Sequence, residues 1–299
     1  MSSRRKKKVK IKWGRFLLCI FVVCAVVLAG LLFWPLPDKA EPSEANTQNI
    51  SDTAEDTELS PEPAEQTEFS LLIRCAGDVM AHMPQVRSAK RSDGTYDFSE
   101  NYVYVTKYFE EADLSLANFE TTFSGDGSYS GYPGFDSPLV LANNVYDAGI
   151  DVALFANNHM LDSRLKGARN TVKVLREAGF TTVVGARYET TDDRSAIREV
   201  NGVKVGIVAY TYETALVNGK RTLNGSYMDS SAPDYINTFR YAKGSDGKTH
   251  VNSEDLASIK SEIEWCRQSG AEIVICYFHW GTEYRQTPDN ADKELAQFA

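Results

Sequence analysis

The chain has 299 residues, of which 42% are hydrophobic and 24% charged, and its formal net charge is −9. This composition is ordinary for a globular protein, and the length allows one large domain with appendages. The sequence argues against nucleic-acid binding, because no basic cluster occurs beyond the N-terminal segment. Outside the apolar N-terminal run only Cys75, Cys266 and Cys276 occur, which form neither a disulfide framework nor a Cys-x-x-Cys zinc pattern.

The N-terminal residues 1–34 predict a location at the membrane. Residues 1–15 are basic and are predicted to be a cytoplasmic tail, and residues 16–34 carry no charge and are just long enough to span a bilayer as a helix. The positive-inside rule then places the rest outside the cytoplasm, as a single-pass cell-membrane protein. A cleaved signal peptide is the alternative, and it gives the same side of the membrane. Residues 35–68 are rich in Pro, Glu, Asp, Ser and Thr and are predicted to be a disordered acidic linker.

Residues 69–299 show strands alternating with helices, which predicts an α/β domain with a largely buried sheet. We expect strands at residues 69–75, 113–117, 150–154, 181–184, 203–209 and 272–277. We expect helices at residues 102–112, 138–148, 167–178 and 254–268, the last capped by Ser253. Residues 124–134 are predicted to form a flap and residues 218–250 a long loop or insertion.

Polar side chains follow four of these strands. They are Asp78, then Asn118 with Glu120, then Asn157, Asn158 and His159, and finally His279 with Glu283. Turn, cap or core roles explain each one singly, but open α/β sheets hold ligands where their strands end. Four coincident cases predict one shared site. Carboxylates, an amide oxygen and imidazoles suit manganese, iron or zinc better than calcium, so we expect one or two divalent metal ions.

At these positions the sequence resembles the CapA family, the bacterial capsule-synthesis proteins linked to poly-γ-glutamate. The matching segments run in family order over nearly all of residues 69–299: Gly77-Asp78-Val79-Met80, Tyr96-Asp97-Phe98, Ala112-Asp113-Leu114, Asn118-Phe119-Glu120, Gly149-Ile150-Asp151, Ala156-Asn157-Asn158-His159, Leu161-Asp162, Gly179, Gly185-Ala186 and His279-Trp280-Gly281-Thr282-Glu283-Tyr284. The family is similar in turn to calcineurin-like metallophosphoesterases. The resemblance therefore implies a β-sandwich flanked by helices, with a two-metal site at the strand ends.

The resemblance also implies roles for individual residues. The implied metal ligands are Asp78, the bridging acid Glu120, the amide of Asn158 and the later histidine His279. His159 resembles the imidazole that faces the leaving group, and substrate contacts are expected from Asn118, Asn157, Trp280, Glu283 and Tyr284. His82 is not at a metal position of the family and is interpreted as a structural or surface residue.

One expected segment does not occur before Ala299. The resemblance implies a Gly-x-His-Pro-His type segment on a further strand, whereas residues 297–299 lie in what we expect to be the helix before that strand. The domain is therefore expected to be C-terminally incomplete. The alternative is that the second metal is poorly held.

The expected function is a membrane-anchored extracytoplasmic protein of capsular poly-γ-glutamate synthesis or export with a metal-dependent hydrolase site. Its expected partners are the membrane and the anionic polymer or its synthase complex. One alternative is a non-catalytic surface scaffold that binds the polymer or the synthase. Another is a generic secreted metallophosphoesterase, because the residues leave open whether a phosphoester or an amide is cleaved.

Overall fold

The computed structural model describes residues 70–282 and 284–299. The predicted cytoplasmic tail (1–15), membrane helix (16–34) and linker (35–68) lie outside these ranges, as does Glu283. Among the described residues, none of the helices combines the length and the hydrophobicity that crossing a membrane requires.

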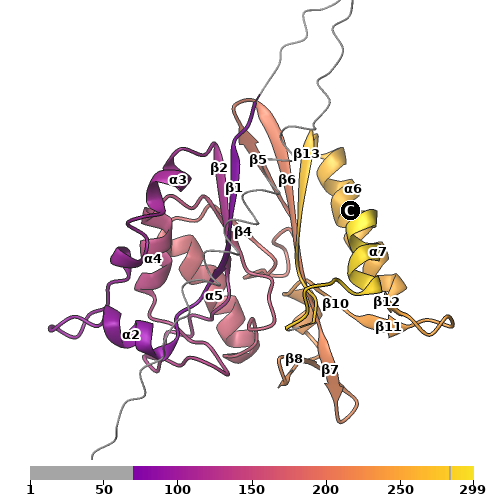
Figure 1. Cartoon of the computed structure of the whole chain (residues 1–299), viewed down its shortest axis with the longest axis horizontal. Helices are drawn as coiled ribbons and strands as arrows, with labels where there is room; N and C mark the ends of the chain where they lie inside the picture. Colours follow the sequence, from indigo (N-terminus) through magenta and orange to yellow (C-terminus); the bar gives the residue numbers. More distant parts are fainter. Residues whose placement is uncertain (1–69, 283) are drawn as a thin grey trace, which may run out of the picture. The chain divides into compact units, whose positions relative to one another are not determined.

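The first sheet has four parallel strands, which lie in the order in which they occur along the chain. They are β1 (Ile73–Val79), β2 (Leu114–Phe119), β3 (Val152–Leu154) and β4 (Thr182–Val184). The connecting helices lie on one side of this sheet (Figure 1): α2 (Met83–Ala89), α3 (Thr106–Glu110), α4 (Val140–Asp147) and α5 (Arg164–Ala178). The pairing of Asp78 with Asn118, and of Asn118 with Leu154, brings three strand ends together at one edge.

The second sheet is built around β6 (Val203–Tyr212). The strands β10 (Thr238–Phe239) and β13 (Ile273–His279) pair with it in parallel, and β5 (Ala196–Val200) pairs with it antiparallel. The helices α6 (Ser253–Gln268) and α7 (Asn290–Phe298) lie on the outer side of this sheet (Figure 1).

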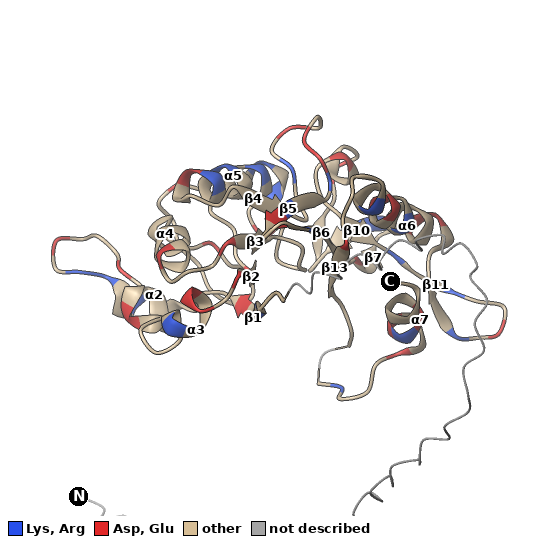
Figure 2. Cartoon of the chain, turned by 90° about the horizontal axis from the view of Figure 1, so that it is seen from above, with Lys and Arg blue, Asp and Glu red and all other residues tan. Residues whose placement is uncertain are grey.

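The two sheets face each other across a shared apolar core. Successive residues of β6 point to opposite faces, as the strand period of two requires. Ile207 packs in the core between the sheets with Leu116 of β2, whereas Val208 packs in the cluster under α6 with Ile259. The resulting layers are helices, sheet, sheet and helices, as seen from above in Figure 2. The α/β class and the flanking helices predicted from the sequence are confirmed.

Three of the hairpins that were not predicted turn on an Asn-Gly pair. The pairs are Asn201-Gly202 between β5 and β6, Asn218-Gly219 between β7 (Thr214–Val217) and β8 (Lys220–Leu223), and Asn224-Gly225 between β8 and β9 (Ser226–Tyr227). Both residues of every pair have positive φ, between 46° and 84°, as the two-residue type I′ turn demands. The Asn-Gly pairs were the available signal, since the other hairpin strands, β5, β7, β8 and β9, are short and lack a clear apolar alternation.

The prediction of a long loop over residues 218–250 was therefore wrong. The hairpin strands β7 (Thr214–Val217), β8 (Lys220–Leu223) and β9 (Ser226–Tyr227) form one small sheet, and β11 (Tyr241–Lys243) with β12 (Thr249–Val251) forms another. Leu223 of β8 is fully buried in the apolar core that lies between the first sheet and its helices. These segments are thus integral to the fold.

Two helix predictions also need correction. The predicted helix over 102–112 is replaced by the 3₁₀ turn Ser99–Asn101 and the short α3, since the intervening β-branched Val103 and Val105 have low helix propensity. The N-cap of α6 is Asn252, not Ser253, and its side chain accepts hydrogen bonds from the backbone nitrogens of Glu254 and Asp255.

Candidate metal centre

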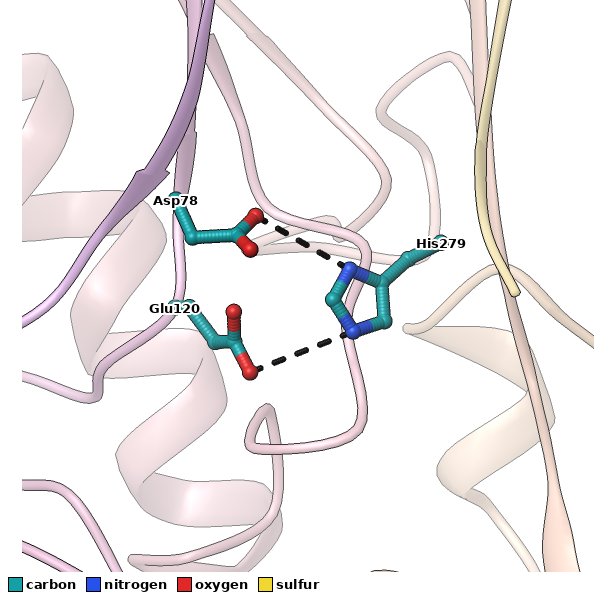
Figure 3. Close-up of side chains that lie close together, drawn as sticks. All are labelled: Asp78, Glu120 and His279. Atoms are coloured by element: carbon teal, nitrogen blue, oxygen red, sulfur yellow. Dashed lines mark ion pairs between the residues drawn. The ribbon is translucent and has the colours of Figure 1, made fainter. Parts of the chain in front are cut away.

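The candidate site lies where strands of both sheets end. Asp78 is the next-to-last residue of β1, and Glu120 directly follows β2. His279 ends β13, where it pairs with Thr211 of β6. Figure 3 shows the two carboxylates of the first sheet pointing toward the imidazole of His279, which comes from the second sheet. Both sheets therefore have to be folded and packed for the cluster to form.

The donor atoms of this cluster are close enough to share one cation. One ligand atom each from Asp78, Glu120 and His279 lie within 4.8 Å of one another. Nε2 of His279, the nitrogen available to a cation, is 3.9 Å from Oε1 of Glu120 and 3.0 Å from Oδ1 of Asn158. The other ring nitrogen, Nδ1, is 4.0 Å from Oδ1 of Asp78. Donors that share one cation at about 2.1 Å each lie about 3–4 Å apart. Two carboxylates, an amide oxygen and an imidazole therefore fit a divalent ion.

The acids of this cluster differ in burial, because Asp78 is exposed and Glu120 is buried. The Glu120 residue is only 6% exposed, and a buried carboxylate is stable only when it is paired or coordinates a metal. Burial lowers the pKa of His279, the neighbouring Asp78 charge raises it, and His159 lowers it further. The net lowering keeps this imidazole neutral, which is the form that binds metals.

Tyr277 lies beside the same imidazole. Its hydroxyl oxygen is 3.5 Å from Nδ1 of His279. Burial raises the pKa of Tyr277, and the charges of Asp78 and Glu120 raise it further. The phenol thus stays neutral and is a hydrogen-bond partner for the outer nitrogen of the histidine, an interaction that orients metal-binding imidazoles.

Two buried asparagines hold the first-sheet side of the cluster in place. Nδ2 of Asn118 donates to Oδ1 of Asp78 at 2.8 Å, and Nδ2 of Asn157 donates to Oδ1 of Asn118 at 3.0 Å. Oδ1 of Asn157 accepts from the backbone nitrogen of His159 at 3.1 Å. Both amides are fully buried. The structure places these two predicted substrate contacts behind the cluster, where they orient Asp78 and His159.

His159 forms a pair with Asp162, a residue that belongs to a matching family segment but had no expected role. Nδ1 of His159 is 2.6 Å from Oδ2 of Asp162, and its Nε2 is 3.6 Å from Oε1 of Glu120. The backbone nitrogen of Phe135 also donates to Oδ2 of Asp162, and the ring of Phe135 meets that of His159 edge-on. The carboxylate favours a proton on Nδ1, which leaves Nε2 to exchange protons. The spacing of three residues between His159 and Asp162 was the available signal.

The cluster opens into a cavity of about 510 Å³. Asp78, Glu120, Asn158 and His279 line it together with Tyr212, Trp280 and residues of the following loop. Of the other predicted substrate residues, Trp280 is therefore in the cavity wall, Tyr284 is fully exposed and outside it, and Glu283 is outside the described residues. His82 is exposed, with its ring against Phe135.

The fold and the site define a class of protein: a two-sheet α/β domain with a candidate divalent-metal centre at the strand ends. The family described as "Bacterial capsule synthesis protein PGA_cap" matches residues 73–299. The chain belongs to this family. The resemblance to capsule-synthesis proteins found in the sequence is confirmed.

Two relatives are similar to this chain over about three quarters of its length. The "Capsule biosynthesis protein CapA" of Bacillus anthracis is 26% identical over 76% of this chain and 50% of its own length. The "PGA biosynthesis protein CapA" of Bacillus subtilis (strain 168) is 25% identical over 74% of this chain and 52% of its own length. The chain thus spans about half the length of these relatives.

Two solved structures are distantly similar to this chain. The "Putative 5'-Nucleotidase from Staphylococcus aureus in complex with alpha-ketoglutarate" aligns with a TM-score of 0.39 and 14% identity over 72% of this chain and 39% of that one. The NAD nucleotidase NadN of Haemophilus influenzae aligns with a TM-score of 0.33 and 16% identity over 62% of this chain and 29% of that one. At these scores neither similarity carries an argument about activity.

Proposed function

We propose that this protein is a membrane-anchored, extracytoplasmic component of capsular poly-γ-glutamate synthesis or export, with a divalent-metal-dependent hydrolase site. The observation that carries the catalytic part is the convergence of Asp78, Glu120, Asn158 and His279 at the ends of strands from both sheets. Membership of the capsule-synthesis family and the name of the Bacillus subtilis relative support the polymer as the substrate or cargo.

The location is proposed from the sequence. The basic residues 1–15 followed by the uncharged residues 16–34 favour a membrane anchor with a cytoplasmic N-terminus. An anchored domain outside the cytoplasm is in the compartment that a capsular polymer has to reach. The membrane and the polymer or its synthase complex are therefore the proposed partners.

The cluster and the His159–Asp162 pair have different roles in the proposed reaction: the cluster would bind the metal, and the pair would transfer a proton. A divalent metal, when bound, would supply Lewis-acid activation of water and of the oxygen at the scissile bond. Asp78, Glu120, Asn158 and His279 would hold that metal. His159 supplies a proton from Nε2 to the leaving group, while Asp162 holds Nδ1 and keeps the ring oriented. Two sheets with outer helices and donors at strand ends support a calcineurin-like metallophosphoesterase type of domain.

Turnover by the full chain tests this proposal. The protein is purified in detergent, loaded with manganese, iron or zinc, and assayed with p-nitrophenyl phosphate and with poly-γ-glutamate. We expect metal-dependent cleavage of one of the two substrates, lost in His159→Ala and kept in Asp147→Asn, which changes an exposed residue outside the site. Shortening of the polymer supports an amide-cleaving role in capsule synthesis, and cleavage of the ester alone points to a general phosphoesterase. A metal-loaded chain that cleaves neither substrate points to the scaffold role and contradicts the hydrolase proposal.

A further inference from the structure

The loop that follows β13 supplies much of the cavity wall beside the cluster. Seven residues of this loop line the cavity: Trp280, Gly281, Thr282, Arg285, Gln286, Thr287 and Pro288. Trp280 stacks on Phe278 of β13, with ring centroids 5.2 Å apart and 26° between the planes. Tyr212, the last residue of β6, lies parallel to the His279 ring at 6.4 Å. The cavity therefore has flat aromatic surfaces next to the metal-type donors.

The charges of the described lining residues are unevenly distributed. The acids are Asp78 and Glu120 of the cluster and Asp292, which is almost fully buried and accepts hydrogen bonds from Tyr241 and from the backbone of Asp289. Among these described lining residues, Arg285 is the one lysine or arginine. A divalent cation in the cluster would cancel the two carboxylate charges there. The described lining charges would then sum to zero, and the exposed guanidinium of Arg285 would be the positively charged side chain among them that an anion can reach.

We propose that Arg285 is an anion-binding residue of this cavity and that it pairs with an oxyanion of the ligand, either a carboxylate or a phosphate, while the aromatic surfaces contact the ligand's apolar parts. This inference rests on the proposed function, because it assumes a metal in the cluster. Arginine suits the task, since its planar fork matches the geometry of carboxylates and phosphates. Its side chain is 61% exposed and so is accessible to a ligand.

Arg285 also has a partner within the loop, and this provides the competing explanation. Nη1 of Arg285 is 3.1 Å from Oδ1 of Asp289, and the other oxygen of Asp289 accepts from the hydroxyl of Thr282 at 2.9 Å. Asp289 thus joins two points of the loop to the start of α7. If Arg285 acted only as a loop clamp, removing the Asp289 charge would have the same effect as removing Arg285.

Calorimetric titration of the full metal-loaded chain distinguishes the two roles. The probes are a γ-linked glutamate trimer, the same trimer with its carboxylates converted to amides, and inorganic phosphate. We expect Arg285→Gln to weaken binding of the preferred anion by about tenfold or more, Arg285→Lys to weaken it less, and Asp289→Asn to leave it intact or tighter. Tighter binding of the trimer than of phosphate identifies a carboxylate ligand, and the reverse identifies a phosphate.

The matched control is Arg267→Gln, which removes an exposed arginine outside the cavity and should bind like the wild type. Metal content and the thermal unfolding midpoint are measured for every variant, and only variants that keep both are compared. Unchanged anion affinity in Arg285→Gln overturns the inference and leaves the proposed metal site standing. Equal losses in Arg285→Gln and Asp289→Asn show a loop clamp and also overturn it. A wild-type chain without metal overturns the proposed function itself.

Discussion

At the scale of single residues, His159 is held on several sides at once. Asp162 contacts its Nδ1, Asn157 accepts from its backbone nitrogen, and Phe135 packs edge-on against its ring. Asn224, from the turn between β8 and β9, also lies 3.2 Å from Nδ1. The imidazole thus has one defined orientation, with Nε2 near Glu120.

Replacing Asp162 should separate orientation of the histidine from metal binding. Asp162→Asn removes the charge that favours the proton on Nδ1, so we expect turnover to fall about 10²- to 10⁴-fold. Metal content, measured by elemental analysis, should stay at the wild-type level because Asp162 is outside the donor cluster. Asp147→Asn is the control. Unaltered turnover in Asp162→Asn would show that His159 does not depend on this pair.

At the scale of secondary structure, the start of α6 provides a direct test of the observed cap. The side chain of Asn252 accepts from two backbone nitrogens in the first turn, at 3.0 and 3.3 Å. We expect Asn252→Ala to reduce the free energy of unfolding by about 1 kcal/mol. Ser253→Ala should change it little, whereas the cap predicted from the sequence would give the opposite order. Chemical denaturation of both variants decides between them.

The β11–β12 hairpin is attached to α7 through a titrating side chain. Nε2 of His250 is 3.1 Å from Oδ1 of Asp246 in the turn, and its Nδ1 is 3.2 Å from Oε2 of Glu294 on α7. Hydrogen bonding to Asp246, followed by that to Glu294, raises the pKa of His250 above 6.5. The protonated form is therefore favoured in the folded protein.

This raised pKa fixes the direction of a pH effect. The stabilisation of the folded protein by protonated His250 is fully present below pH about 6.5. It is lost as the pH rises through the higher pKa that His250 has in the folded protein. We expect the unfolding midpoint of the wild type to exceed that of His250→Gln at pH about 5.5 and the difference to shrink by pH about 8.5. A difference that is constant or grows with pH would show that His250 is not stabilised as a cation.

The elements themselves show where sequence reasoning succeeds and where it stops. The strands ending near Asp78, Glu120 and His279 were recognisable because apolar runs ended in polar residues. The hairpins of residues 196–227 were missed because their strands other than β6 are short and carry few alternating apolar side chains, although Asn-Gly pairs marked the turns. The cap of α6 was misplaced by one residue because asparagine and serine both cap well, and only backbone geometry selects one.

At the scale of the whole molecule, the site depends on how two separate sheets pack. The sequence indicated that donors follow several strands, but it does not specify that Asp78 and Glu120 come from one sheet and His279 from another. That arrangement follows from the core in which Leu116 and Ile207 meet. The orienting roles of Asn118 and Asn157 likewise depend on long-range contacts, which residue type and spacing do not reveal.

Because the donors come from both sheets, bound metal should stabilise the entire domain. A ligand that binds only the folded state, present at a concentration of about a hundred times its dissociation constant, adds about 2.7 kcal/mol to the free energy of unfolding. We therefore expect the wild type to unfold at a higher temperature with excess divalent metal than with a chelator. The variants Asp78→Ala and His279→Ala should lose this shift.

Elemental analysis of the purified full chain, beside Asp78→Ala, His279→Ala and the control Asp147→Asn, tests the central claim most directly. We predict one or two equivalents of manganese, iron or zinc in the wild type and the control, and a loss of metal in both cluster variants. A wild type that neither contains nor takes up a divalent metal, or cluster variants that keep it, would contradict the assignment of this site.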